Sequence, residues 1–296
     1  MTIAAASVTG GANATASLLP PLLLGLGSAA ALAWPLREPL AMRWRRGRIA
    51  RRPFPAEWRD ILRRRVPLVQ ALPADLQLRL KKLIQVFLAE KPFIGCGGLL
   101  VSEEMRVTVA AQACLLRLGQ RGPLAGLDLF PGLRQILLYP APFIVEHEHN
   151  DGVLTRRDRS VRLGESSSQG QVVLSWPDVL AGAADPADGH NVVLHEFAHQ
   201  LDQQGGAFAN GAPWLPGGRR RRERWARVLG DEFAALRRRV ARGETGLLDA
   251  YGAQDAAEFF AVATEAYFEQ PAQLAAQHPA LFDELCACYR LKPLSW

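Results

Sequence analysis

Two histidines and one glutamate in this 296-residue chain lie at a spacing that suits metal binding and water activation: His195, Glu196 and His199, in the run His-Glu-Phe-Ala-His. On an α-helix, residues four apart differ by only about 40° around the axis, so both imidazoles would face one zinc ion. Glu196 would point roughly 100° away, too far round to bind the metal but within reach of a water molecule that the metal holds. The spacing therefore predicts a hydrolytic zinc site with Glu196 as the general base. The competing interpretation is a coincidental motif in a buried helix.

A catalytic zinc ion needs a third protein ligand, and none of the remaining histidines has a compelling spacing for that role. His147 and His149 occur in a polar stretch that we expect to form an exposed loop. His190 precedes the predicted metal-binding helix, and His278 lies between the last two predicted helices. The third ligand is therefore better sought among the carboxylates.

Glu258 is the strongest acidic candidate because it opens a segment of apolar, helical character that begins near Asp255. A carboxylate in that position could point at the metal. It could equally form a capping pair with Asp255, in which Glu258 only accepts a hydrogen bond from a backbone N–H at the start of the helix. Spacing alone leaves both interpretations open.

The elements that must position these residues are mostly helical, since apolar residues recur at helical spacing along much of the chain. Short apolar segments separated by Gly, Asn, Asp and Ser predict a few strands. The strand at 171–175 could be an edge strand that pairs with an extended peptide, or an interior strand. The predicted class is α+β, mostly helical with a small mixed sheet. We expect helices at residues 56–72, 74–90, 102–118, 191–203, 218–242, 256–269 and 279–289, and strands at 135–139, 153–155, 160–163 and 171–176.

The charge distribution favours local basic faces over a nucleic-acid-binding protein. The chain has 35 Lys+Arg against 29 Asp+Glu, a formal net charge of +6, and the arginines concentrate near residues 43–65 and 219–239. The four cysteines form neither a CxxC pair nor a zinc-ribbon pattern, which fits a reducing compartment. We therefore expect a cytoplasmic protein with no nucleic-acid partner.

The N-terminal region differs in composition from the rest of the chain. No charged side chain occurs before Arg37, and residues 18–36 are apolar and just long enough to span a bilayer, although prolines interrupt them. The arginines that follow would keep the remainder in the cytoplasm, as an inner-membrane-anchored alternative. A third interpretation is that the native chain starts at Met42. We expect residues 1–41 to be a disordered extension or a membrane anchor, 42–54 an Arg-rich linker, and 55–296 the peptidase domain.

Several segments together resemble the Mlc titration factor A family of zinc peptidases, and the similarity extends from about Pro55 to Pro293. The order and spacing of the motifs make the resemblance specific. The segments that carry it are Leu-Tyr-Pro-Ala-Pro-Phe at 138–143, His-Glu-Phe-Ala-His-Gln-Leu-Asp at 195–202, Asp-Ala-Tyr-Gly-Ala at 249–253, Ala-Glu-Phe-Phe-Ala-Val at 257–262 and Glu-Ala-Tyr-Phe at 265–268.

The resemblance implies a zincin-like metallopeptidase domain with one zinc ion, Zn²⁺, bound by His195, His199 and Glu258. It also implies a gluzincin-like site arranged as in anthrax lethal factor, with Glu196 as the catalytic base. A tyrosine seven residues before the third ligand assists the reaction in such sites, and Tyr251 occupies that position. Alternatively, Tyr251 only packs within its loop.

Two further carboxylates, Asp202 and Glu265, follow a predicted ligand by seven residues, nearly two helical turns, and could orient it. Ordinary helix-surface roles are the alternative for both. The resemblance implies aminopeptidase-like hydrolysis of short peptides, together with a regulatory role through binding a transcriptional repressor of sugar transport. The alternative function is a non-catalytic sequestering protein that binds a transcription regulator. Membrane contact would involve residues 18–36.

Overall fold

The computed structural model describes residues 40–120, 122, 128–150, 155–162, 164–167, 170–205, 209–213, 215 and 217–296, with the backbone alone described for residues 143–150, 155–162 and 164–167. The chain divides into two compact units, residues 1–45 and 46–296. In the first unit only residues 40–45 are described, and they are helical. The predicted anchor at 18–36 lies outside the described residues. Within the described part of the chain, no helix combines the length and the apolar character needed to cross a membrane.

The second unit begins with helices that build one side of its core. The segment 56–72, predicted as a single helix, is broken into α2 and α3 because Val66 precedes Pro67, and a residue before proline is disfavoured in the helical conformation. Ser102 caps α5 by accepting a hydrogen bond from the backbone N–H of Met105. The helices are α2 (Ala56–Arg65), α3 (Leu68–Ala71), α4 (Ala74–Glu90) and α5 (Glu103–Leu115).

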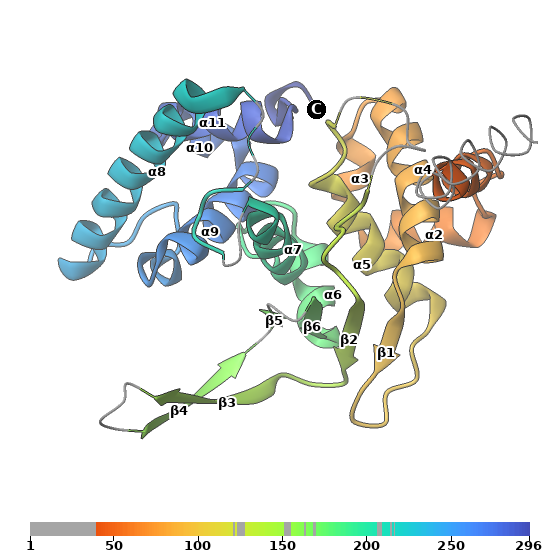
Figure 1. Cartoon of the computed structure of the whole chain (residues 1–296), viewed down its shortest axis with the longest axis horizontal. Coiled ribbons are helices and arrows are strands. Elements are labelled where there is room, and N and C mark those ends of the chain that lie inside the picture. The colour runs from red at the N-terminus through yellow and green to blue at the C-terminus, as the bar shows by residue number, and fades with distance from the viewer. Residues whose placement is uncertain are drawn as a thin grey trace, which may run out of the picture. The chain divides into compact units, whose positions relative to one another are not determined.

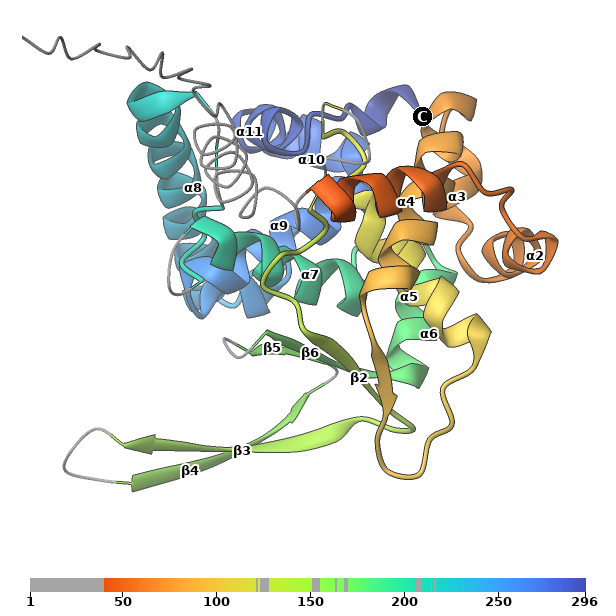
Figure 2. The same ribbon diagram turned by 45° about the vertical axis from the view of Figure 1, so that its right-hand side comes forward.

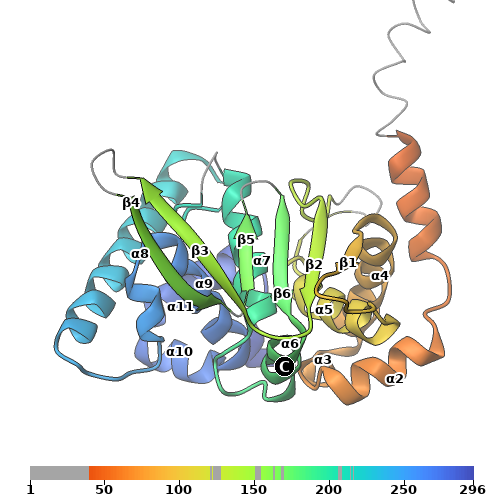
Figure 3. The same ribbon diagram turned by 90° about the horizontal axis from the view of Figure 1, so that it is seen from below.

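A four-stranded mixed sheet lies beside these helices (Figure 3). Its strands are β1 (Phe93–Gly95), β2 (Gln135–Tyr139), β6 (Gln171–Ser175) and β5 (Gly164–Ser167), in the order β1-β2-β6-β5. The first three are parallel and β5 is antiparallel to β6. We predicted that residues 171–175 form either an edge strand or an interior strand. They form the interior strand β6, and β5 lies at the edge of the sheet beside it.

A separate two-stranded ribbon pairs β3 (Phe143–Asn150) with β4 (Thr155–Arg162). Our prediction that His147 and His149 lie in a loop was wrong, because both belong to β3. The predicted strands at 153–155 and 160–163 were also wrong in extent, since β4 is continuous where it is described. A ribbon of largely polar residues lacks the apolar alternation from which strands are predicted.

The C-terminal half is helical, and within it α9 packs against the motif helix α7 (Figures 1 and 2). Two helices that we did not predict, α6 and α10, each have a proline in the first turn, where its fixed φ suits a helix start. The elements are α6 (Trp176–Ala184), α7 (Val192–Asp202), η2 (Gln203–Gly205), α8 (Gly218–Ala241), η3 (Ala250–Ala253), α9 (Ala256–Glu269), α10 (Pro271–Gln277), α11 (Pro279–Tyr289) and η4 (Pro293–Ser295). The predicted α+β class, mostly helical with a small mixed sheet, is confirmed.

Buried aromatic rings hold α7 in the core. The ring of Phe197 lies 4.9 Å from that of Phe130 and 5.8 Å from that of Phe87, measured between centroids. All three side chains are fully buried. Edge-to-face and tilted packing of this kind favours one orientation of the rings. The helix that carries the motif is thus fixed in its rotation about its own axis.

Candidate metal centre

The helix α7 begins immediately before the motif because Asn191 caps it. The Asn191 side chain accepts a hydrogen bond from the backbone N–H of Leu194, at 3.0 Å. Val193, Leu194 and Phe197 are fully buried on the core side of the helix. With that face occupied, His195 and the residue one turn later, His199, are directed toward α9.

The side-chain atoms of His195, His199 and Glu258 converge on one point. The Nε2 atoms of the two histidines lie 3.2 Å apart, and Oε2 of Glu258 lies 2.9 Å from the first and 3.4 Å from the second. Ligand atoms around a tetrahedral zinc ion with bonds of 2.0–2.2 Å are separated by roughly 3.3 Å. Two imidazole nitrogens and one carboxylate oxygen at these separations fit a divalent metal. Among the described residues, these three form the candidate metal cluster.

Glu258 reaches the histidines although it lies in the first turn of α9. Asp255 caps that helix, and its side chain accepts hydrogen bonds from the backbone N–H groups of Ala257, at 2.8 Å, and Glu258, at 3.0 Å. The cap therefore leaves the Glu258 carboxylate available. Burial alone would raise the pKa of Glu258, but hydrogen bonds from His195 and His199 outweigh it and hold that pKa well below its ordinary value.

A chain of hydrogen bonds supports His195 from behind. Its Nδ1 lies 2.8 Å from Oε1 of Glu265, whose Oε2 accepts from the backbone N–H of Asn191 at 2.5 Å. A carboxylate only accepts, so Nδ1 carries the proton that faces Glu265, and a metal bound at Nε2 would replace the proton that faces Glu258. Burial would lower the pKa of His195, but hydrogen bonds with Glu258 and Glu265 raise it well above its ordinary value. Glu265 is thus a supporting residue rather than a surface carboxylate.

A second buried carboxyl continues this chain. The Asn191 side chain donates to Oε1 of Glu269 at 2.8 Å. Burial, the largest cause, raises the pKa of Glu269 to about 8, and the neighbouring Glu265 acts in the same direction. Glu269 is therefore mainly neutral at pH 7.

Asp202, the other carboxylate of uncertain role, binds the loop that follows α7. It is fully buried and accepts hydrogen bonds from the backbone N–H groups of Gly211, at 2.6 Å, and Ala212, at 2.8 Å. Burial raises the pKa of Asp202 although these bonds oppose the shift. Its role is to tie the loop that follows α7 to the end of that helix.

A cavity of about 410 Å³ lies beside the metal cluster and is lined by His195, Glu196 and Tyr251. Glu196 is 4% exposed. The Tyr251 ring lies 5.9 Å from the His195 ring and is 39% exposed, and Asp249 orients its backbone by accepting from its N–H at 2.6 Å. That exposure argues against tight packing of Tyr251 within its loop. The phenol is placed on the same side of His195 as the cavity.

Other residues at the site were not found by sequence reasoning. The asparagine cap, Asn191, could have been recognised from its place before an apolar helix, and Glu269 from its spacing of three turns after Glu258. Asp178 and Asp188 line the cavity from α6 and from the segment between α6 and α7, and no sequence pattern connects them with the motif.

The remaining histidines are not part of the candidate metal cluster. His190 lines the cavity, while His278 pairs with Glu232 at 2.7 Å. His147 and His149 lie in β3, where only the backbone is described.

Comparison with known proteins decides which family uses this arrangement. Residues 41–290 match the family described as glucose-regulated metallo-peptidase M90. The chain belongs to this family. A metal-dependent hydrolytic centre is therefore expected of the M90 chain, in agreement with the cluster at α7 and α9.

Relatives extend over most of the M90 chain. An uncharacterised protein of Synechocystis sp. is 38% identical over 253 residues, 85% of this chain and 90% of the relative. The Mlc titration factor A of Enterobacter sp. (strain 638) is 33% identical over 232 residues, 77% of this chain and 84% of the relative. That of Salmonella agona is 34% identical over 239 residues, 80% of this chain and 86% of the relative. The resemblance seen in the sequence motifs is confirmed.

Proposed function

We propose that this member of the M90 family is a zinc-dependent peptidase that acts on short peptides as an aminopeptidase. The observation that carries the proposal is the convergence of His195, His199 and Glu258 beside a cavity that His195 and Glu196 line. Zinc held by the first three residues would polarise the substrate carbonyl and acidify water.

The chain's own residues then have distinct tasks. Glu196 accepts a proton from the attacking water and passes it to the leaving nitrogen. The Tyr251 hydroxyl donates a hydrogen bond to the oxygen that gains negative charge, which stabilises the transition state more than the bound substrate. Glu265 keeps the proton of His195 on Nδ1.

The acidic lining of the cavity favours a free peptide N-terminus. Asp178, Asp188 and Asp249 line it together with Glu196, so the α-ammonium group of a substrate would be attracted there. The outer edge of β5 offers backbone groups to which an extended peptide could hydrogen bond.

A Glu196→Gln variant of the full chain tests the chemistry, with alanine p-nitroanilide and its N-acetylated form as substrates. We expect zinc content to be unchanged and kcat to fall by about 10²- to 10⁴-fold. Glu223→Gln, on the exposed surface of α8, is the matched control and should leave kcat unchanged. Undiminished turnover by Glu196→Gln would refute the mechanism. Equal turnover of the two substrates would refute the aminopeptidase assignment alone.

The names of the Enterobacter and Salmonella relatives, Mlc titration factor A, support a second proposal: the chain also binds a transcriptional repressor of the Mlc type. This binding needs no hydrolysis. Glu196→Gln should therefore capture purified Mlc as strongly as the unmodified chain does in a calorimetric titration. Loss of Mlc binding in that variant would contradict binding that is independent of hydrolysis. Absence of Mlc binding in both the variant and the unmodified chain would refute the proposal.

We further propose that residues 55–296 act as the peptidase domain in the cytoplasm, joined through the Arg-rich segment 42–54 to the apolar N-terminal residues. Membrane fractionation of chains starting at Met1 and at Met42 tests whether the N-terminal residues act as an anchor. Identical fractionation of both chains would exclude an anchor.

A further inference from the structure

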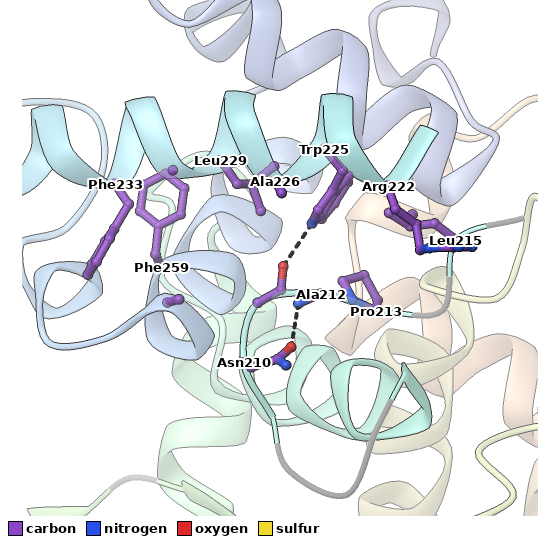
Figure 4. Close-up of a pocket in the computed structure, with 13 residues that line it drawn as sticks. Asn210, Ala212, Pro213, Leu215, Arg222, Trp225, Ala226, Leu229, Phe233 and Phe259 are labelled. Atoms are coloured by element: carbon purple, nitrogen blue, oxygen red, sulfur yellow. Dashed lines mark hydrogen bonds between the residues drawn. The ribbon is translucent and has the colours of Figure 1, made fainter. Parts of the chain in front are cut away.

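A second cavity, of about 440 Å³, lies between α8 and the loop that follows α7 (Figure 4). One wall is a face of α8 that presents Trp225, Leu229 and Phe233. The opposite side is formed by residues 210–213 and 215 and by Phe259 near the start of α9. It shares no lining residue with the cavity of the metal centre. A volume of this size is typical of small-molecule sites.

The polar groups of this wall are already used within the protein. The indole N–H of Trp225 donates to the carbonyl oxygen of Gly211 at 2.8 Å, as Figure 4 shows. The backbone N–H groups of Gly211 and Ala212 donate to Asp202. A sugar or nucleotide would find few partners here, and an apolar group would lose little by leaving water.

Small residues keep the cavity open along α8. Ala226 and Gly230 are exposed between the larger apolar side chains of that helix face. A Cβ atom added at Gly230 would meet no other atom within 4 Å. A side chain at position 230 would therefore enter open space, which a ligand chain can occupy.

Positive charge gathers at one end of the cavity. Arg222 lines it there, within four consecutive arginines that begin α8. That helix start has no acidic residue in its first turn and no side-chain cap, so the helix dipole adds to the positive potential. Arg219 pairs with Glu223, whereas Arg222 has no acidic partner among the described residues.

We propose that this cavity binds a single-chain fatty acid, with the apolar chain against Trp225, Leu229 and Phe233 and the carboxylate on Arg222. One unbranched chain suits an apolar trough of this volume, and Arg222, the one cationic side chain among the described residues that line it, matches a single anionic head group. The site is independent of the proposed peptidase chemistry.

Calorimetric titration of the full chain with octanoate, nonanoate and decanoate, below their micelle concentrations, tests the proposal. EDTA is present so that the carboxylate cannot bind a metal instead. We expect one site per chain and a Kd that falls about fourfold for each added CH₂ group. Decanol should bind more weakly than decanoate. No binding, or affinity independent of chain length, would overturn the proposal.

Three variants locate the site. Arg222→Gln should weaken decanoate binding by about tenfold or more, because a charge-assisted hydrogen bond is lost. Arg220→Gln makes the same charge change two residues earlier, about 160° round the helix and outside the cavity, and should have little effect. Gly230→Leu fills the trough and also removes a helix glycine, so it should abolish binding without lowering the unfolding midpoint.

Two patterns would contradict the assignment in these variants. Equal losses in Arg220→Gln and Arg222→Gln would indicate general charge attraction instead of a site. Unchanged decanoate binding by a folded Gly230→Leu variant would place the ligand elsewhere. Tighter binding of N-acetyl-Ala-Leu than of decanoate would assign the cavity to peptide C-termini rather than to fatty acids.

Discussion

Replacing Glu265 by glutamine should weaken zinc binding although it changes no residue of the candidate metal cluster. Glu265 accepts from Nδ1–H of His195 with one oxygen and from the Asn191 backbone N–H with the other. A glutamine amide has only one acceptor oxygen, so in either orientation its NH₂ group meets another donor. Losing one hydrogen bond of a charged acceptor costs roughly 1.5–3 kcal/mol.

That free energy corresponds to about a 10- to 100-fold increase in the zinc Kd, which matches the usual effect of altering such supporting residues. Competition against a chromophoric chelator measures the Kd, and kcat at saturating zinc separates metal loading from chemistry. The matched control is Glu269→Gln. Because burial raises the pKa of Glu269 to about 8, this carboxyl is mainly neutral at pH 7, as a glutamine amide is. The zinc Kd of Glu269→Gln should therefore lie within about twofold of that of the unmodified chain. Equal zinc affinities of the two variants would refute the reasoning.

Three further predictions concern stability. Glu269 has a raised pKa in the folded chain, so its contribution to the unfolding free energy is fully present below about pH 4.5 and is lost as the pH rises toward 8. The unfolding free energy should therefore decline by a few kcal/mol over this range. Urea titrations of Glu269→Gln should lack that part of the decline. Phe197→Ala should lower the unfolding free energy of the metal-free chain by about 3–5 kcal/mol, and a loss below 1 kcal/mol would contradict its place in the aromatic core. Gly211→Ala should lower the thermal midpoint, since φ is +76° and the new Cβ would lie 2.5 Å from the carbonyl oxygen of Ala256; an unchanged midpoint would contradict that close approach.

Local patterns were sufficient to predict much of the helical framework. The helix around the motif and the helix that Glu258 opens were both predicted within a residue or two, because each combines a capping residue with apolar residues at helical spacing. Prediction was weaker where the local pattern was polar or interrupted. The ribbon of β3 and β4 has no apolar alternation. The segment 56–72 was predicted as one helix although Pro67 interrupts it.

The amino-acid sequence by itself determined the helical spacing of His195 and His199, the displacement of Glu196 from them, and Glu258 as the best acidic candidate, since these depend on helix geometry and on residue type. Only the tertiary structure decided that α9 lies against α7, so that Glu258 meets both histidines while Asp255 alone caps its helix. The support of His195 by Glu265 was likewise decided by packing. Contacts between residues 63 and 70 positions apart depend on how two helices cross, and no local pattern encodes that crossing.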